Sequence, residues 1–128
     1  MDIGKLKNNK EFSAEKICPE YVEPNIILSM KESPEFNLFI WDGYFVKIFG
    51  DPIFTDKDWV GFTRDYQEDV NGWDRATEIE NIDEYIWDML RYSEREYSWQ
   101  ETPEVFNLII DFLTYAKETG QTVIVEKD

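Results

Sequence analysis

The sequence predicts an α+β fold, in which two helices pack on one face of a mostly antiparallel sheet. Two long stretches near the C-terminus carry apolar residues at helical spacing, and shorter aromatic or β-branched segments with turn residues between them lie before and after these stretches. The chain has 128 residues, the size of one ordinary domain. We therefore expect a single domain over residues 1–128 with one hydrophobic core.

The N-terminal 24 residues are charged and contain two prolines. They predict a short helix over Lys10–Ile17 with an arm around it. The helix should end at Cys18, because a residue that precedes proline is pushed out of the helical region. A loosely packed arm without a helix is the alternative.

The strongest turn signal is Asp42-Gly43, which stands between the apolar segments Phe36–Trp41 and Tyr44–Phe49. A two-residue type I′ turn needs positive φ at both central residues, and Asp-Gly adopts it at low cost. We therefore predict a β-hairpin. Because both of its faces are apolar, it should lie in the centre of the sheet and be covered on each side.

Two further strands are predicted before the helices. Residues Trp59–Tyr66 alternate in the manner of a strand, and Asn71-Gly72 is a second turn signal. Residues Trp73–Ile79 are then the return strand.

The first long helix is predicted to begin after Asn81. Asn81 and Glu84 form a capping-box pattern, in which each side chain bonds the backbone of the other. The apolar residues that follow fall on one helical stripe: Ile82, Tyr85, Ile86, Met89 and Leu90.

The second long helix opens with Thr102 as cap and Pro103 at the first helical position. Its buried face is broad: Val105, Phe106, Ile109, Ile110, Phe112, Leu113 and Ala116. Lys117 and Gly120 are typical of a helix end. Residues Thr122–Val125 are predicted as the last strand.

The charge of the chain excludes several classes of function. There are 13 basic and 28 acidic residues, a net charge of −15, and no histidine. Nucleic-acid binding through a basic surface is excluded, because it requires clustered lysine and arginine. A histidine base, a histidine metal ligand and a Ser-His-Asp triad are excluded as well. Aromatic residues make up 16% of the chain, too many for a disordered acidic tail.

Cys18 is the single cysteine and has no partner for an internal disulfide, which favours a reducing compartment. The N-terminus lacks the apolar run of a signal peptide. The apolar stretch Val105–Ala116 is too short and too polar for a membrane span. We therefore expect a cytoplasmic protein with no membrane partner.

The negative charge is concentrated in the middle of the chain. Residues 51–100 hold 14 acidic and 5 basic residues, and bulky aromatic residues lie among the acids. An acidic face that only keeps the protein soluble is one interpretation. However, a net charge of about 2 to 8 is enough for solubility, and Trp and Tyr are frequent anchors of interfaces.

We therefore predict a surface that binds a basic protein partner. It is built from carboxylates around the aromatic anchors Tyr66 and Trp73, and its members are Asp65, Tyr66, Glu68, Asp69, Trp73, Asp74 and Glu78. Trp87 falls off the apolar stripe of its helix and Trp99 lies in a polar loop, so we expect both to be exposed as well.

We predict no metal site, no cofactor and no enzymatic activity. Residues 67–78 approach the pattern of a twelve-residue calcium loop, but Gln67 stands at the first position, where a carboxylate is expected. With 28 acidic residues, a pair at the spacing of a glycosidase carries no information.

In size, acidity, aromatic content and predicted fold class, the chain resembles small immunity proteins of bacterial polymorphic toxin and contact-dependent growth inhibition systems. The resemblance is to this general type and rests on no motif. It implies a cognate toxin as partner, in particular a nuclease with a basic surface, which the protein would neutralise by occlusion. A nucleic-acid mimic that inhibits a DNA-binding enzyme, or an adaptor domain, remains the alternative.

Overall fold

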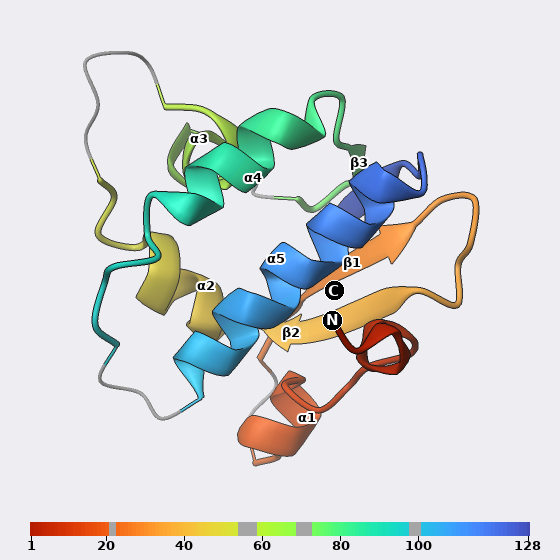
Figure 1. The fold of residues 1–128 in the computed structure, drawn as a ribbon. Coiled ribbons are helices and arrows are strands. Elements are labelled where there is room, and N and C mark those ends of the chain that lie inside the picture. The colour runs from red at the N-terminus through yellow and green to blue at the C-terminus, as the bar shows by residue number, and fades with distance from the viewer. Residues whose placement is uncertain (21–22, 54–58, 69–72, 98–100) are drawn as a thin grey trace.

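The computed structural model describes residues 1–20, 23–53, 59–68, 73–97 and 101–128 (Figure 1). In chain order the elements are the 3-10 helix η1 (Ile3–Leu6), α1 (Ala14–Ile17), β1 (Asn25–Met30), β2 (Asn37–Trp41), α2 (Asp42–Phe49), α3 (Gly61–Glu68), β3 (Thr77–Glu78), α4 (Ile82–Leu90), α5 (Thr102–Glu118) and β4 (Val123–Lys127).

The strands form one antiparallel sheet in the order β2-β1-β4-β3. In the centre of the sheet, Leu28 of β1 lies between Leu38 of β2 and Val125 of β4. These three side chains are buried, whereas their neighbours along each strand are only partly covered. The α+β class with an antiparallel sheet is confirmed.

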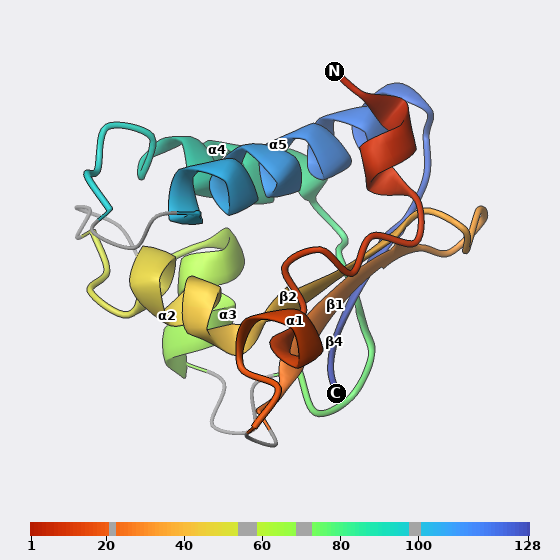
Figure 2. The same ribbon diagram turned by 90° about the horizontal axis from the view of Figure 1, so that it is seen from below.

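Helices α4 and α5 form a layer on one side of this sheet (Figures 1 and 2). Helix α5 crosses the sheet in front of β1 and β2, and α4 lies beside α5 in the same layer (Figures 1 and 2). Helices α2 and α3 lie next to the sheet, below α4 and α5 in the view of Figure 2. The two helices predicted near the C-terminus therefore form a layer, and α4, α5 and β4 confirm the predicted elements.

The predicted hairpin at Asp42-Gly43 is wrong. Residues 37–41 do form a strand, but the chain enters helix α2 directly at Asp42, and β2 pairs with β1 instead. The buried residues of α2 are spaced four apart, Tyr44 with Ile48 and Phe45 with Phe49, so that a helix buries all four on one face.

The strand predicted over Trp59–Tyr66 is also wrong, because residues from Gly61 onward form helix α3. Of the predicted return strand, only Thr77–Glu78 is a strand, and it pairs with β4. The turn at Asn71-Gly72 lies outside the described residues.

The N-terminal region forms two short helices. The predicted helix over Lys10–Ile17 is reduced to Ala14–Ile17, and η1 precedes it. Between them the backbone of Lys7 and Asn9 forms bridges to Phe36 and Leu38, which fixes this arm against the edge of β2. In the described part of the chain, no helix combines the length and the apolar character needed to cross a membrane.

Candidate functional site

Trp73 is not the exposed anchor that the sequence predicts. Its indole is 3% exposed and packs edge-on against the rings of Phe45 and Phe62, with centroid distances of 5.8 and 6.0 Å. The chain buries this ring because α2 and α3, which the sequence predicted as strands, meet around it. The prediction of an aromatic anchor at Trp73 is therefore wrong.

Asp65 and Tyr66 are engaged within the protein. The carboxylate of Asp65 accepts a hydrogen bond of 2.6 Å from the Tyr85 hydroxyl and is paired with Arg64 at 3.1 Å. Burial and this bond to Asp65 raise the pKa of Tyr85 above the range of an exposed tyrosine. The Tyr66 ring is partly buried and packs near Trp73, so that burial raises its pKa too.

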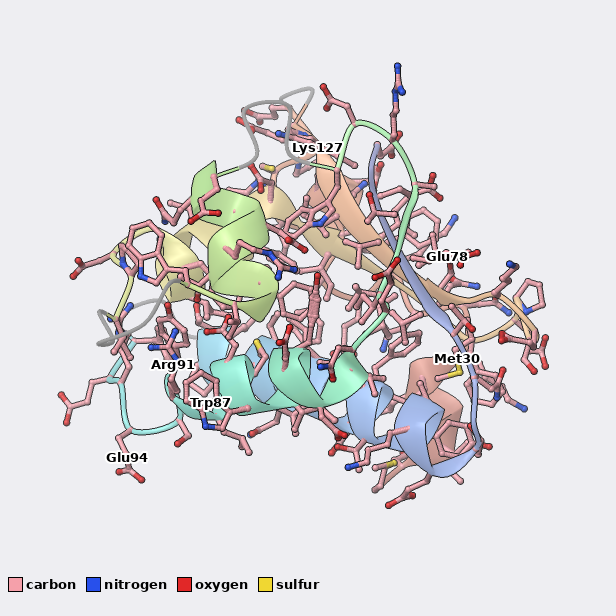
Figure 3. All side chains as sticks on the ribbon, turned by 90° about the horizontal axis from the view of Figure 1, so that it is seen from above. Met30, Glu78, Trp87, Arg91, Glu94 and Lys127 are labelled. Atoms are coloured by element: carbon pink, nitrogen blue, oxygen red, sulfur yellow. The ribbon has the colours of Figure 1, made fainter. Side chains whose placement is uncertain are left out.

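The remaining predicted residues do not share one face with an aromatic anchor. Glu68, Asp74 and Glu78 are exposed, and Asp69 lies outside the described residues. The Glu78 carboxylate pairs with Lys31 at 2.7 Å beside the sheet. Figure 3 shows Glu78 on the side of the molecule away from Trp87. The six members that the structure describes therefore do not form the continuous patch that the sequence predicts.

The exposed aromatic residue of this region is Trp87, as the sequence predicts. Its side chain is 53% exposed, and Leu90, one helical turn further along α4, is 50% exposed. Leu90 was expected on the buried stripe, and that part of the prediction is wrong. The sequence did contain a signal for this exposure: Leu90 is three residues from Trp87, and residues at this spacing are neighbours on a helix surface. Trp99 lies outside the described residues.

A charged side chain covers one side of the Trp87 ring. The guanidinium of Arg91 lies 5.0 Å from the ring centroid, within the range of a cation–π contact. The same guanidinium pairs with Asp88 at 2.5 Å and donates a hydrogen bond of 3.0 Å to the backbone carbonyl of Ile53. Figure 3 shows Trp87 and Arg91 side by side, with Glu94 further along the chain.

Asp88 is fully buried, although it belongs to the acidic stretch of residues 51–100, which the sequence predicts to be largely exposed. Its carboxylate accepts hydrogen bonds from the backbone N–H of Thr63, at 2.8 Å, and from the Thr63 hydroxyl. The Tyr92 hydroxyl lies 2.7 Å from that of Thr63. Asp88 of α4 therefore occupies the N-terminal end of α3, where a helix favours negative charge. We call Asp88, Thr63, Arg91 and Tyr92 the α3–α4 clasp.

The charges of residues 80–97 are segregated between inside and outside. This segment holds six acidic residues and two arginines. Both arginines turn inward, since Arg91 bonds the Ile53 carbonyl and Arg95 donates to the Ile48 carbonyl at 3.0 Å. The acids that remain exposed are Glu80, Asp83, Glu94 and Glu96. From α5, Lys117 pairs with Asp83. The outer side of this segment thus presents mainly carboxylates around Trp87 and Leu90.

A cleft of about 350 Å³ lies between the N-terminal arm and α5, and its lining includes Lys5, Phe12 and the acidic residues Glu11, Glu104 and Asp111. Among the residues that the structure describes, no group of three or more histidine, cysteine or acidic side chains is arranged to hold a metal ion. The described surface exposes carboxylates and apolar side chains, both of which can take part in recognition.

No protein-family model, curated protein or solved structure matches this chain.

Proposed function

We propose that this protein is an inhibitor of the immunity type, which binds a cognate bacterial toxin through that toxin's basic surface and neutralises it by occlusion. A nuclease domain is the toxin class that fits best, because an enzyme that binds phosphate groups presents lysine and arginine around its active site. The chain carries the complementary charge, −15 over 128 residues.

The observation that carries this proposal is the outer side of residues 80–97. This segment exposes four carboxylates and two apolar side chains, and both of its arginines bond backbone carbonyls inside the protein. Carboxylates on a surface of this kind speed the approach of a basic partner and oppose the approach of an acidic one. An exposed indole supplies the apolar contact area that dominates the affinity of many protein interfaces.

The same observation favours a protein partner over mimicry of a nucleic acid. A mimic needs carboxylates at the positions of phosphates, and an exposed indole beside Leu90 adds nothing to that imitation. A protein partner, in contrast, gains affinity from burying both side chains.

The test is a protection experiment. We expect a toxin domain to be encoded beside this gene. That domain is expressed from an inducible promoter, with and without this protein, and survival is measured. We expect survival only with this protein, together with a complex whose association rate falls steeply as the salt concentration rises. Cell death in the presence of the protein, with no complex between the purified proteins, would refute the proposed function.

A further inference from the structure

We infer that Trp87 and Leu90, which we call the α4 anchor, insert into an apolar pocket rimmed by lysine or arginine on the toxin, and that Arg91 is a positioning residue that holds the Trp87 ring ready for docking. This inference rests on the proposed function and names the surface that would carry it. The partner chemistry follows from the charges that flank the anchor.

The α4 anchor is a pair and not an isolated exposed residue. Trp87 and Leu90 are separated by one turn of the same helix, and each exposes about half of its side chain. Val46 of α2, by comparison, is exposed to a similar extent, 48%, but Phe49, three residues further along, is fully buried. Adjacent exposed apolar side chains with a polar rim are typical of binding surfaces, whereas single ones are common on any protein.

The ring of Trp87 is held from one side. Arg91 cannot leave the ring easily, because its guanidinium is also bound to the buried carboxylate of Asp88 and to the Ile53 carbonyl. The Arg91 side chain is only 11% exposed, so that solvent competes weakly for these bonds. The α3–α4 clasp therefore fixes Arg91, and Arg91 restricts the ring.

A restricted ring binds more tightly than a mobile one. Immobilising a flexible side chain at an interface costs free energy that corresponds to a factor of about 2 to 10 in Kd. In this protein part of that cost is already met when the chain folds. Trp87 remains accessible to a partner, because it is 53% exposed.

The charged residues next to the α4 anchor indicate the kind of partner that it would bind. Asp83 lies one turn before Trp87 on the outer side of α4, where it pairs with Lys117 of α5, and the exposed Glu94 follows Leu90 by four residues. The inward orientation of Arg91 and Arg95 removes the positive charges of this segment from the rim. A pocket bordered by cationic side chains is complementary to this arrangement.

The experiment measures association and dissociation rates for the catalytically inactive form of the toxin domain encoded beside this gene. We expect Trp87→Ala to weaken binding by about 30-fold or more, mainly through faster dissociation, as for a central anchor residue. Glu94→Lys should slow association. The matched controls are Val46→Ala, which removes an exposed apolar side chain elsewhere, and Glu35→Lys, which makes the same charge change in the turn between β1 and β2. Both should bind like the unaltered protein, apart from the small effect of net charge on association.

The role of Arg91 needs a measurement that does not depend on the partner. In the free protein, the ¹H–¹⁵N heteronuclear NOE of the Trp87 indole, assigned by its loss in Trp87→Phe, should equal that of the backbone of α4. Arg91→Lys keeps a positive charge beside Asp88 but loses the planar group, so that the NOE should fall and binding should weaken by about 2- to 10-fold. A mobile indole in the unaltered protein would overturn the positioning role, even if Arg91→Lys fails to fold.

The two proposals fail in different ways. If the unaltered protein binds the toxin domain and Trp87→Ala binds it equally well, the α4 anchor is wrong and the inhibitor function stands. If the unaltered protein neither protects nor binds, the inhibitor function is overturned, and the docking surface with it.

Discussion

The α3–α4 clasp makes a strong prediction for stability. Replacing Asp88 by alanine removes a fully buried carboxylate that accepts two hydrogen bonds from Thr63 and pairs with Arg91 at 2.5 Å. The variant leaves a nearly buried guanidinium without its counter-charge and the N–H of Thr63 without its acceptor. Loss of one partner of a buried ion pair costs about 3–5 kcal/mol, a large part of the stability of a domain of this size.

The assay is urea unfolding followed by tryptophan fluorescence, to which five indoles contribute. With an m-value of about 2 kcal/mol/M, a loss of about 4 kcal/mol lowers the midpoint by about 2 M. Asp88→Asn should lie between alanine and the unaltered protein, because the amide oxygen can still accept from Thr63 while the charge is lost.

A matched control lies five residues earlier on the same helix. Asp83 also forms an ion pair of 2.5 Å, with Lys117, but its side chain is 68% exposed. Asp83→Ala should therefore cost less than about 1 kcal/mol, since exposed pairs are weak and the charge near the start of a helix adds little. Equal midpoints for Asp83→Ala and Asp88→Ala would show that the buried clasp does not hold α3 to α4.

Three further predictions follow from the same packing. Gly61 and Gly120 both have positive φ, but a Cβ at Gly61 would lie 2.9 Å from that of Asp88, whereas nothing lies within 4 Å at Gly120. Gly120→Ala should cost about 1 kcal/mol in thermal unfolding and Gly61→Ala at least twice as much; equal costs would contradict the close approach of α3 and α4. The pKa of Tyr85 is higher in the folded protein than in the unfolded chain. Its contribution to the free energy of unfolding is therefore complete below about pH 10 and falls by about 1.4 kcal/mol per pH unit as the pH rises above that value. Tyr85→Phe should flatten this alkaline loss in urea titrations at pH 9 to 11, and an unchanged slope would assign the loss to other groups. Glu78→Ala breaks the exposed pair with Lys31 and should change stability by less than about 1 kcal/mol, so that a larger loss in the same titration would show a buried role.

The elements that the sequence predicts correctly carry their signals within one helix or strand. For α4 and α5, the spacing of apolar residues lies inside the segment itself. The predicted caps are wrong, because Asn81 makes no side-chain cap hydrogen bond and Thr102 is the first residue of α5 rather than its cap. The segment Tyr44–Phe49 carries two signals, since its apolar residues fit both a strand covered on two faces and a helix with residues four apart. The pairing of β1 with β2 decides between them, because β2 then needs no partner from the segment that follows it.

Helix α3 could not be located from its own residues. Its N-terminal N–H group is satisfied by Asp88, which lies 25 residues further along the chain, and its start is a glycine with positive φ. A capping residue supplied by another helix leaves no local pattern, whereas Asn81 and Glu84 stand at the start of α4. The strand-like alternation over Trp59–Tyr66 was therefore the only local signal available.

The same reasoning explains which part of the proposed binding surface could be foreseen. Trp87 stands out because it falls off the apolar stripe of its own helix, and a helix has only one buried side there. Trp73 gives no such signal, because it is buried by rings of α2 and α3 that reach it from distant parts of the chain.

Counting carboxylates locates a charged region but does not say which of them face a partner. Asp65 and Asp88 belong to the same acidic stretch as several exposed acids, yet both are held by hydrogen bonds from tyrosine, threonine or arginine inside the protein. These bonds have a second effect, because the arginine that neutralises Asp88 is thereby withdrawn from the surface and placed beside Trp87. The buried polar network thus leaves the outer side of α4 negative and restrains its exposed ring. The stability of the α3–α4 clasp and the affinity of the α4 anchor should consequently respond to the same substitution at Arg91.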